Sequence, residues 1–526
     1  MANRRILLIE PGYKNKYPPL GLMKLAQYHG PNGKRDHVTF IKGEDRSALL
    51  QHWDRIYVTT LFSFEWKRIS QAIDFAIEAA RGHTSNVFVG GIAASLMHDS
   101  FLEESRWRGV RFINGLLKSA PAKSLQLSQF EDELYSDDVA GRPIEDHIPD
   151  YDILKQVDYR YAVSDAYFAY ASRGCIRKCS FCGVPKLEGD LYETPSLSNI
   201  IRGIERLYGP KKDLILMDNN VVALPRFKEV VAEIRDLGFT RGAKLSRGRV
   251  AVQRRVDFNQ GVDARILCKD PMFLEQLSTI CIKPLRIAFD HLGLRKPYET
   301  AIRYAHEVGL DDLSNYMLYN FHDSPADLYQ RMRLNIELNV ELGIRIFSFP
   351  MRYQPTDRKD RTFVGDRWNR YFLRSMQIIL QATHGVVSGE PTYFKHAFGA
   401  SVDEFESLLM RPHHFIFNRA WYEEYGGVDE FHEYVSELRM LSAADRADLV
   451  ATLFTFENRH FEAVRSKISN RAVLKMFRFY QPLNDSQEAE IWAQQKLAER
   501  AIQAVPNLPD DERVEDAGLE LEQSLT

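Results

Sequence analysis

The stretch Tyr-Phe-Ala-Tyr-Ala-Ser-Arg-Gly-Cys-Ile-Arg-Lys-Cys-Ser-Phe-Cys-Gly, residues 167–183, contains three of the chain's five cysteines. Cys175, Cys179 and Cys182 have the spacing C-x3-C-x2-C. The apolar residues before them predict a buried strand, and Gly174 would free the turn that begins the following loop. Three thiolates from one compact loop can hold a [4Fe–4S] cluster and leave one iron open to a further ligand. The stretch therefore predicts a strand that leads into an iron–sulfur loop.

Phe181 stands directly before the last cysteine, so the motif closely resembles the C-x3-C-x-aromatic-C signature of the radical S-adenosylmethionine (radical SAM) superfamily. The resemblance implies a [4Fe–4S] cluster whose open iron chelates the amino and carboxylate groups of S-adenosylmethionine (SAM), with Phe181 and Gly183 beside it. It also implies an enzyme, because the reduced cluster splits the sulfonium of SAM to give a 5′-deoxyadenosyl radical. The alternative is a structural zinc site, but zinc needs four tetrahedral ligands, and no fourth Cys or His follows at a short spacing.

Length and composition bound the class of protein. The chain of 526 residues is long enough for about three domains, and its 44% hydrophobic and 27% charged residues are ordinary for a soluble globular protein. A net charge of −3 does not indicate a general nucleic-acid binder. The cysteines do not suggest a disulfide framework, and we find neither a signal peptide nor an apolar run of ~20 residues. We therefore expect a cytoplasmic protein without a membrane span.

Short apolar runs alternate with helical patterns in residues 1–142. The runs are 5–10, 38–41, 56–60, 87–89 and 110–113, and the helical stretches include 20–28 and 69–80. Such alternation predicts a doubly wound, Rossmann-like α/β domain with ligands at the carboxyl ends of its strands.

This region resembles the cobalamin-binding-like domain that precedes the barrel in one large branch of the radical SAM superfamily. The matching residues follow the first, third and fourth runs, and they are Tyr17, Leu20, Gly21, Ser63, Gly90 and Gly91. The resemblance implies that they approach a corrin or its nucleotide tail, whereas the alternative for the glycines is a tight strand-to-helix turn. The Asp-x-His-x-x-Gly motif that supplies a lower histidine ligand is absent, and members of the branch occur with and without cobalamin. Cobalamin binding therefore stays open.

Strand-like runs recur through residues 161–356, after a linker at 143–160 that mixes prolines and acids. They begin near residues 167, 214, 257, 285, 315 and 344. The later intervals are close to the ~30 residues of one βα unit. We therefore expect a partial (β/α)6 TIM-type barrel, as the superfamily has, with its chemistry at the carboxyl ends of the strands.

Polar residues follow the second run of this barrel, where Asp218, Asn219 and Asn220 come directly after an apolar segment. At this place relatives have a Gly-Gly-Glu element that holds the amino group of SAM. An acid and two amides are also competent acceptors for an ammonium group. The alternative is that Asp218 caps the helix that follows.

The third run leads into Asn-Gln-Gly-Val-Asp-Ala-Arg, residues 259–265, which resembles an Asn-Gln-Gly-x-Asp-Ala-Arg element of the same branch. The resemblance implies that Gln260 bonds the ribose hydroxyls of SAM and that Arg265 pairs with its carboxylate through the planar guanidinium fork, with Asp263 beside them. The alternative is that Asp263 and Arg265 simply pair with each other. Asp290, at the end of the fourth run, completes the predicted cofactor site.

Three further segments have a distinctive composition. Residues 240–255 contain six basic residues and no acid, which indicates either a solvated loop or a contact with phosphate in RNA or a small molecule. Residues 357–505 have a helical pattern and would form a helical domain over the barrel mouth. Residues 506–526 are acidic, and we expect them to be disordered.

The cysteine positions limit the kind of radical enzyme. Residues 1–174 contain no cysteine and none follows Cys281, so a second cluster is not expected. We expect a radical SAM enzyme acting on a small molecule or peptide, with or without cobalamin-dependent methylation, and an electron donor such as flavodoxin or ferredoxin. One alternative is modification of RNA or a nucleotide through residues 240–255. Another is a non-catalytic iron–sulfur protein. The identity of the substrate does not follow from these residues.

Overall fold

The computed structural model describes residues 4–117, 143–456 and 460–503, which form two compact units. The first unit comprises Met1–Phe289, Gly293–Tyr316 and Tyr353–Phe363, and the second comprises Asp290–Leu292, Met317–Arg352 and Val364–Thr526. Helices and parallel strands alternate along much of the chain, so the predicted α/β class is confirmed. The finer domain boundaries given above stay predictions.

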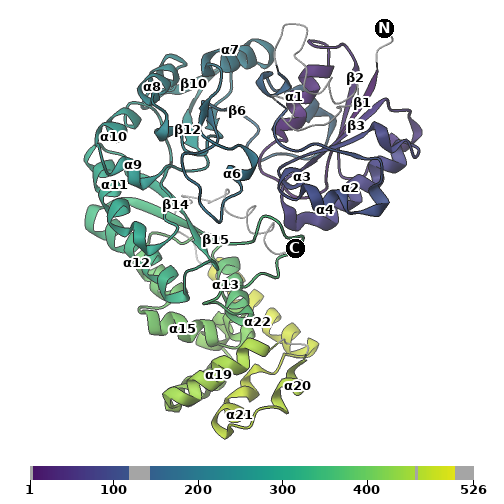
Figure 1. The fold of residues 1–526 in the computed structure, drawn as a ribbon. Helices are drawn as coiled ribbons and strands as arrows, with labels where there is room; N and C mark the ends of the chain where they lie inside the picture. The colour runs from purple at the N-terminus through teal and green to yellow at the C-terminus, as the bar shows by residue number, and fades with distance from the viewer. Residues whose placement is uncertain (1–3, 118–142, 457–459, 504–526) are drawn as a thin grey trace. The chain divides into compact units, whose positions relative to one another are not determined.

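Five parallel strands form the first sheet of the first unit, in the order β2-β1-β3-β4-β5 (Figure 1). They are β1 (Arg5–Glu10), β2 (His37–Lys42), β3 (Arg55–Thr60), β4 (Val87–Gly91) and β5 (Arg111–Phe112). Each strand coincides closely with one of the apolar runs predicted from the sequence. Because a parallel sheet is covered on both faces, its strands are almost continuously apolar, and this made them easy to predict.

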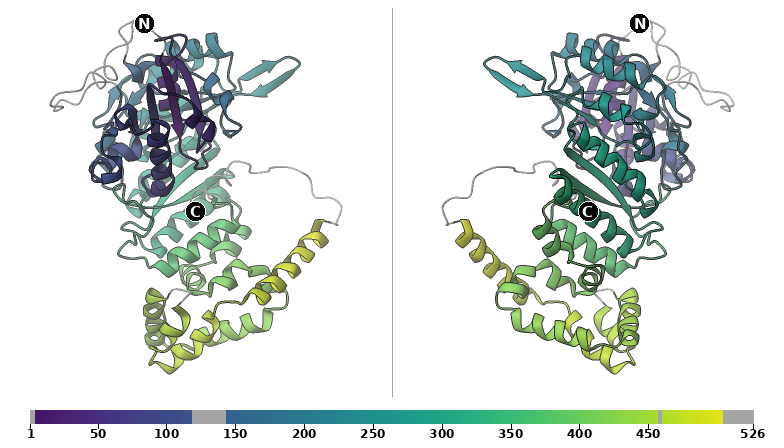
Figure 2. Two further views of the ribbon diagram at one scale, coloured as in Figure 1. Left: turned by 90° about the vertical axis from the view of Figure 1, so that its right-hand side faces the viewer. Right: turned by 90° about the vertical axis from the view of Figure 1, so that its left-hand side faces the viewer.

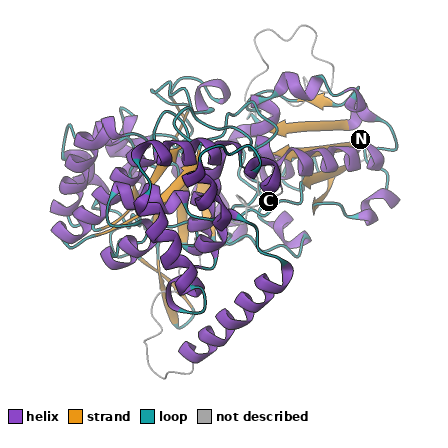
Figure 3. Ribbon diagram, turned by 90° about the horizontal axis from the view of Figure 1, so that it is seen from below, coloured by secondary structure: helices purple, strands orange, loops and turns teal. Residues whose placement is uncertain are grey.

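Helices lie on both faces of this sheet (Figure 3). On one face α1 (Leu20–His29) places its buried His29 2.9 Å from the Tyr57 hydroxyl of β3. On the other face α2 (Trp66–Ala79) packs into a hydrophobic core that includes Val58 of the same strand. Successive residues of a strand point to opposite faces, so β3 contributes to both layers.

The two three-stranded sheets are built from strands that follow in chain order. They are β6 (Ala166–Ala169), β9 (Asp213–Leu216), β12 (Arg255–Phe258), β13 (Leu285–Arg286), β14 (Asp312–Tyr319) and β15 (Arg345–Arg352). The helices between them are α7 (Leu197–Tyr208), α8 (Phe227–Asp236), α9 (Ala264–Leu267), α10 (Met272–Leu277), α11 (Arg295–Glu307) and α12 (Pro325–Leu342). All six strands begin close to the predicted positions, and their sheet orders are β12-β9-β6 and β13-β14-β15.

Parallel pairing brings the carboxyl ends of the first strands in this series to one edge. Phe168 of β6 pairs with Ile215 of β9, and Leu216 of β9 pairs with Phe258 of β12. An isolated parallel bridge between Val262 and the residue after β13 continues the series. The cysteine loop and the polar residues that follow β9 and β12 therefore emerge at this carboxyl edge.

Residues 240–255 are not the loop that the sequence indicated. They form an antiparallel hairpin of β10 (Lys244–Arg247) and β11 (Val250–Gln253), which extends away from the rest of its unit in Figure 2. Most of its side chains are exposed, so the hairpin buries no apolar face that a sequence pattern could reveal. It precedes β12 and therefore stands at the amino-terminal edge of that strand, opposite the carboxyl edge.

The second unit is mainly helical beyond β15. Its helices are α13 (Arg370–Ala382), α14 (Pro391–Phe398), α15 (Val402–Met410), α16 (His413–Phe417), α17 (Arg419–Glu424), α18 (Val428–Met440), α19 (Ala443–Thr455), α20 (Phe461–Arg465), α21 (Arg471–Phe477) and α22 (Asp485–Gln503). Many of them share an aromatic core that includes Phe415, Tyr434 and Phe477. The acidic segment 506–526 lies outside the described residues. Within the described residues, every helix is too short or too polar to cross a bilayer.

Candidate functional site

The cysteine loop lies between β7 (Ser172–Arg173) and α6 (Val184–Leu187), and its three cysteines are half-buried. The backbone N–H of Arg177 donates to Cys175 Sγ at 3.4 Å. The N–H of the first residue of α6 donates to Cys182 Sγ, also at 3.4 Å. Hydrogen bonds to sulfur stabilise thiolates and tune the potential of iron–sulfur clusters. The loop thus offers sulfur ligands that its own backbone supports.

Gly174 begins the loop with a φ of +72°, in the left-handed region that favours glycine. A Cβ added there would lie 2.1 Å from the carbonyl oxygen of Asp190. The next residue, Cys175, donates its N–H to the Gly189 carbonyl at 3.3 Å. The predicted turn glycine is therefore confirmed, and the loop is closed against the residues that follow α6.

The donor set fits an iron–sulfur cluster better than a single metal ion. Within the described residues, no group of three or more His, Cys, Asp or Glu side chains is arranged to hold one metal ion. The zinc alternative therefore has no ligand set in that part of the chain. Each cysteine of a [4Fe–4S] cluster binds a different iron, so the three sulfurs can stand farther apart than the ligands of one ion.

Asp218 is buried after β9, and both of its oxygens accept hydrogen bonds from the backbone after β6. Its Oδ2 accepts from Ala171 N at 3.0 Å, and its Oδ1 accepts from Ser172 N at 2.5 Å and from Ser172 Oγ at 2.6 Å. Burial raises the pKa of Asp218 to about 6, although these bonds act to lower it. The carboxylate joins the ends of two strands rather than capping a helix. Its predicted contact with the amino group of SAM stays a prediction.

The two asparagines after Asp218 differ in their contacts. The Asn219 amide donates to Glu188 Oε2 at 2.8 Å, next to the start of the cysteine loop. Asn220 is buried, and its Oδ1 has no hydrogen-bond partner in the described part of the chain. A buried acceptor without a donor is costly. The predicted contact of Asn220 with the amino group of SAM stays a prediction.

Asp263 holds two arginines beside the cysteine loop. Its Oδ1 accepts from Arg265 Nε at 2.7 Å and its Oδ2 from Arg177 Nε at 2.8 Å. Burial acts to raise the pKa of Asp263, but the bonds from the two guanidinium groups hold it below its ordinary value. The predicted Asp263–Arg265 pair is thus present, and the carboxylate role of Arg265 stays a prediction. The sequence analysis missed Arg177, although it lies inside the cysteine signature.

Asn259 ties the N-terminal part of the chain to this edge. The Tyr17 hydroxyl donates to Asn259 Oδ1 at 2.5 Å, and the Tyr17 ring meets Phe168 of β6 edge-on at 6.2 Å. Tyr17 was expected to face a corrin, and in the structure it contacts the predicted SAM-binding segment. Gln260, the next residue in the chain, is exposed, and its contact with the ribose of SAM stays a prediction.

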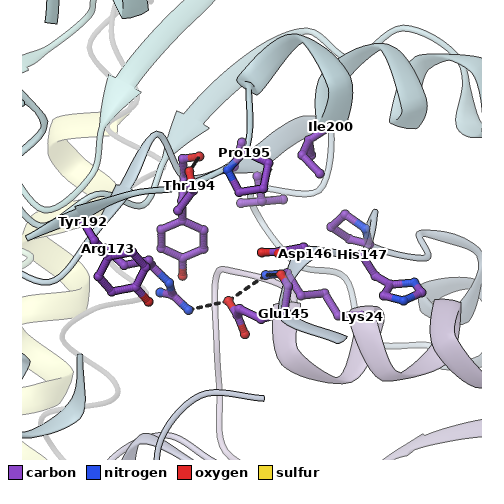
Figure 4. Close-up of a pocket in the computed structure, with 13 residues that line it drawn as sticks. Lys24, Glu145, Asp146, His147, Arg173, Tyr192, Thr194, Pro195 and Ile200 are labelled. Atoms are coloured by element: carbon purple, nitrogen blue, oxygen red, sulfur yellow. Dashed lines mark hydrogen bonds and ion pairs between the residues drawn. The ribbon is translucent and has the colours of Figure 1, made fainter. Parts of the chain in front are cut away.

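A chain of buried charges leads from α1 to the cysteine loop (Figure 4). Glu145 of η5 (Ile144–Asp146) accepts from Lys24 Nζ at 2.8 Å and from Arg173 Nη2 at 2.5 Å, beside a cavity of about 40 Å³ that has room for one water. Burial lowers the pKa of Lys24, and the nearby Glu145 carboxylate offsets part of this shift. Burial acts to raise the pKa of Glu145, but Lys24 and Arg173 outweigh it and lower that pKa. The predicted linker is therefore a structural part of the site, which sequence reasoning missed.

The glycines expected near cobalamin have different environments. Gly91 has a φ of +105°, and a Cβ there would lie 2.3 Å from the Thr60 carbonyl oxygen. The tight-turn alternative is therefore sufficient for Gly91. A Cβ on Gly90 would make an ordinary 3.6 Å contact, and one on Gly21 would meet open space. The remaining expected residues, Leu20 and Ser63, are half-buried at the start of α1 and η2 (Ser63–Glu65).

The helix that follows β4 reaches the cysteine loop. A Cβ on Gly183 would lie 2.9 Å from Leu96 Cδ1 of α3 (Ile92–Leu96) and 3.6 Å from Thr356 Cγ2. Gly183 therefore allows α3 to approach the loop closely. Phe181, two residues earlier, is half-buried. The carboxyl edge of the N-terminal sheet and the cysteine loop are thus neighbours in the first unit.

A cleft of about 430 Å³ opens where β1 and β2 end, lined in part by Lys14, Lys42 and Asp45. The buried Lys42 ammonium lies 3.0 Å from Glu10 Oε2 and 4.2 Å from the centre of the Tyr159 ring. Burial lowers the pKa of Lys42, and the nearby Glu10 acts to raise it. The carboxyl edge of the first sheet therefore carries a cleft of ligand size.

Asp290 belongs to the second unit, where it lies near the buried Arg331. Burial lowers the pKa of Arg331, and the carboxylates of Asp323 and Asp290 act to raise it. Arg331 Nη2 donates to Asp323 Oδ2 at 2.9 Å. Asp290 therefore contributes to the charge balance around Arg331, and its predicted contact with SAM stays a prediction.

No protein-family model matches the chain. An uncharacterized methyltransferase of Synechocystis sp. is 24% identical to it over 226 residues, which cover 41% of this chain. The match spans only 38% of that relative's own length.

The structure is also similar to solved structures of two proteins. The radical SAM methyltransferase TsrM of Kitasatospora setae, with cobalamin and a [4Fe–4S] cluster bound, matches with a TM-score of 0.44 and 16% identity over 68% of this chain and 77% of that one. The same enzyme with tryptophan substrate and a SAM analogue matches with a TM-score of 0.45 and 15% identity over 68% and 75%. The cobalamin-dependent SAM radical enzyme OxsB, in its apo form, matches with a TM-score of 0.45 and 13% identity over 99% and 83%. TsrM and OxsB are both described as SAM radical enzymes, the superfamily whose cysteine signature this chain resembles.

Proposed function

We propose that this chain is a radical SAM enzyme in which Cys175, Cys179 and Cys182 hold a [4Fe–4S] cluster with one open iron. The observation that carries the proposal is the cysteine loop itself, with three half-buried thiols and backbone N–H groups directed at two of the sulfurs. When bound, such a cluster supplies one electron to the sulfonium of SAM, which breaks a carbon–sulfur bond to give methionine and a 5′-deoxyadenosyl radical.

The proposal includes a specific layout of the chain. The sheet β2-β1-β3-β4-β5 would be a Rossmann-like domain, the six strands from β6 to β15 a partial (β/α)6 barrel, and the helices from α13 onward a separate helical region. The support is the strand order of the first sheet and the chain order of the six strands. In both arrangements the carboxyl ends of the parallel strands would lie at one edge, which is where such folds bind their ligands.

The residues around the loop would bind and orient SAM. Asn220 Oδ1 is a buried acceptor without a described donor, and it would receive the ammonium group of the methionine moiety. Asp263 accepts from the Nε atoms of Arg177 and Arg265 and so holds both arginines beside the cysteine loop, where their guanidinium groups would pair with the carboxylate of SAM. Gln260 is exposed and would bond the ribose hydroxyls.

We further propose that the reaction is a cobalamin-dependent methylation of a small molecule or peptide. The support is the close approach of α3 to Gly183, which makes the carboxyl edge of the N-terminal sheet a neighbour of the cysteine loop. Gly21, which has open space beside its Cα, and Gly90, whose added Cβ would make only an ordinary contact, would face the corrin or its nucleotide tail. When bound, cobalamin supplies a cobalt that carries a methyl group between SAM and the substrate.

The RNA alternative is less well supported than the small-molecule proposal. The basic hairpin stands at the amino-terminal edge of β12, whereas the cysteines lie at the carboxyl edge, a strand length of roughly 13 Å away. Several of its basic side chains also have structural partners: Arg247 pairs with Asp165 at 2.6 Å, and Arg254 lies 3.7 Å from the centre of the Phe239 ring. We propose a flavodoxin or ferredoxin as the electron donor.

The function is tested by anaerobic reconstitution followed by analysis of the products. Wild-type protein should bind about four irons and, with reductant and SAM, release 5′-deoxyadenosine. The variant with all three cysteines replaced by Ala should bind no cluster and form no product. Iron retained in that variant would refute the proposed cluster, and a cluster without SAM cleavage would leave the non-catalytic alternative.

A further inference from the structure

Glu188, directly after α6, gathers three donors from the start of the cysteine loop and its surroundings. Its Oε2 accepts from Gly174 N at 2.7 Å and from Asn219 Nδ2 at 2.8 Å. Its Oε1 accepts from Arg173 Nη1 at 2.9 Å. The Glu188 side chain is only 8% exposed, so these bonds replace water rather than compete with it.

The residues after Glu188 hold the same part of the loop. The Gly189 carbonyl accepts from Cys175 N at 3.3 Å, and the Asp190 side chain forms an ion pair with Lys178. Asp190 also approaches Gly174 so closely that no side chain would fit there. Residues 188–190 therefore restrain the backbone of Gly174 and Cys175 through hydrogen bonds and a close backbone contact.

The charges of this region balance. Arg173 lies between Glu188 and Glu145, and Glu145 also pairs with Lys24. All four side chains are largely buried, so removing either carboxylate leaves an excess positive charge near the loop. The two carboxylates differ in one respect, because of the two only Glu188 is bonded to the loop backbone.

We propose that Glu188 is a positioning residue for the cluster: by bonding the Gly174 N–H it fixes the backbone of Cys175, and through Asn219 it ties that cysteine to the end of β9. This proposal rests on the proposed function of the loop. It assigns a role to a residue outside the C-x3-C-x2-C signature. The role is to restrain one particular iron ligand, which differs from a general contribution to stability.

The test compares Glu188→Gln with Glu145→Gln as a matched control. Both changes remove one negative charge beside Arg173. Only the first leaves a single acceptor oxygen for Gly174 N, Asn219 Nδ2 and Arg173 Nη1, so the Gly174 N–H must compete with the Arg173 guanidinium for it. In the apo-protein, alkylation of each cysteine by iodoacetamide is followed by mass spectrometry. Cys175 should react about fivefold faster in Glu188→Gln, as expected when one restraining hydrogen bond is lost, while the other two cysteines keep their wild-type rates. In Glu145→Gln all three cysteines should react as in the wild type.

In the reconstituted protein, Glu188→Gln and Glu145→Gln distinguish the effect of a lost charge from the effect of a displaced cysteine. Both variants should raise the reduction potential of the cluster, because an added positive charge favours the reduced state; 59 mV corresponds to a tenfold change in the ratio of reduced to oxidised cluster. Only Glu188→Gln should change the line shape of the electron paramagnetic resonance spectrum. Glu188→Asp keeps the charge but shortens the side chain, so it should loosen Cys175 without the shift in potential.

Three outcomes decide the matter. A selective rise in the reactivity of Cys175 in Glu188→Gln and Glu188→Asp supports the proposal. Identical cysteine reactivity and line shape in Glu188→Gln and Glu145→Gln would overturn it, since Glu188 would then act only as a charge. If the wild-type protein binds no cluster, the proposed function fails, and the alkylation rates of the apo-protein still show whether Glu188 restrains Cys175.

Discussion

Asp218 is a fully buried carboxyl group whose pKa departs clearly from its ordinary value. Burial raises its pKa to about 6, against about 4 in an unfolded chain. The folded state therefore holds this proton through a range in which the unfolded state has released it. Stability from this group is present below about pH 4 and is lost as pH rises through about 6.

The prediction is that Asp218→Asn removes this pH dependence. Between pH 4 and 7 the wild type should lose roughly 3 kcal/mol of unfolding free energy relative to the variant, which has no group to ionise at this position. Urea unfolding of both proteins at several pH values measures the difference. A constant difference across this range would mean that Asp218 has an ordinary pKa.

Asp263 makes a second prediction at the residue scale. In Asp263→Asn the amide NH₂ would face one of the two guanidinium groups that the carboxylate now holds, so Arg177 or Arg265 should move. SAM affinity should fall about tenfold, as expected for the loss of a hydrogen bond to a charged group, and iron content should not change. Calorimetric titration with SAM measures the effect.

The control for this change is Asp165→Asn, which breaks an ion pair of similar geometry with Arg247 at the amino-terminal edge. SAM affinity should stay at the wild-type value there. Equal affinities in all three proteins would remove Asp263 and its arginines from the SAM site.

Among the secondary-structure elements, the turn between β4 and α3 contains a glycine, Gly91, that the backbone itself requires. Substitutions there and at Gly21 can distinguish a structural glycine from one that faces a ligand. Gly91→Ala should destabilise the protein by about 1–3 kcal/mol, because the left-handed backbone and the Thr60 carbonyl leave no space for a side chain. Gly21→Ala should be neutral in thermal unfolding, since the space beside Gly21 is open.

Cobalamin retention should therefore be tested away from Gly91. Wild-type protein incubated with hydroxocobalamin and desalted should keep about one equivalent, and bulky replacements such as Gly21→Trp or Gly90→Val should reduce it without loss of fold. Full retention in both variants would place the corrin elsewhere, and no retention by the wild type would favour chemistry without cobalamin.

The hairpin of β10 and β11 gives the next prediction. Replacing its exposed tip, residues 246–251, by two glycines should leave iron content and SAM cleavage unchanged, because the tip stands at the amino-terminal edge. Loss of activity on an RNA substrate, together with salt-dependent RNA binding by the wild type alone, would instead revive the RNA alternative.

The elements were predictable to different degrees, and burial explains why. The strands β1 to β4 and β6 are apolar because both faces of a parallel sheet are covered, so they could be predicted from apolar runs in the sequence. The hairpin has no buried face, so its sequence has only a charge bias and reads as a loop. Motifs local in sequence, such as the three cysteines, were visible at once.

Contacts between distant residues were not predictable. Glu188 meets Gly174 across 14 residues, and Tyr17 meets Asn259 across 242. No periodicity or spacing encodes such pairs, because they depend on how separate elements pack. The linker acid Glu145 was missed for the same reason, since nothing in its surroundings marks it as buried.

Across the whole chain, we propose different tasks for the two edges of the strands from β6 onward. The carboxyl edge carries the cysteines, the buried acceptor Asn220 and the arginines held by Asp263, and the N-terminal sheet adds its own carboxyl edge next to the loop through α3. The amino-terminal edge carries the basic hairpin. All the chemistry is thus proposed at the carboxyl edges.

Electron paramagnetic resonance of the reduced, reconstituted protein tests whether three cysteines hold a cluster whose open iron binds SAM. We predict the signal of a reduced [4Fe–4S] cluster whose g values shift when SAM is added, and the loss of that signal when Cys175, Cys179 and Cys182 are replaced by Ala. A cluster signal that SAM leaves unchanged, or that survives in the triple variant, would show that these cysteines do not hold a SAM-binding cluster.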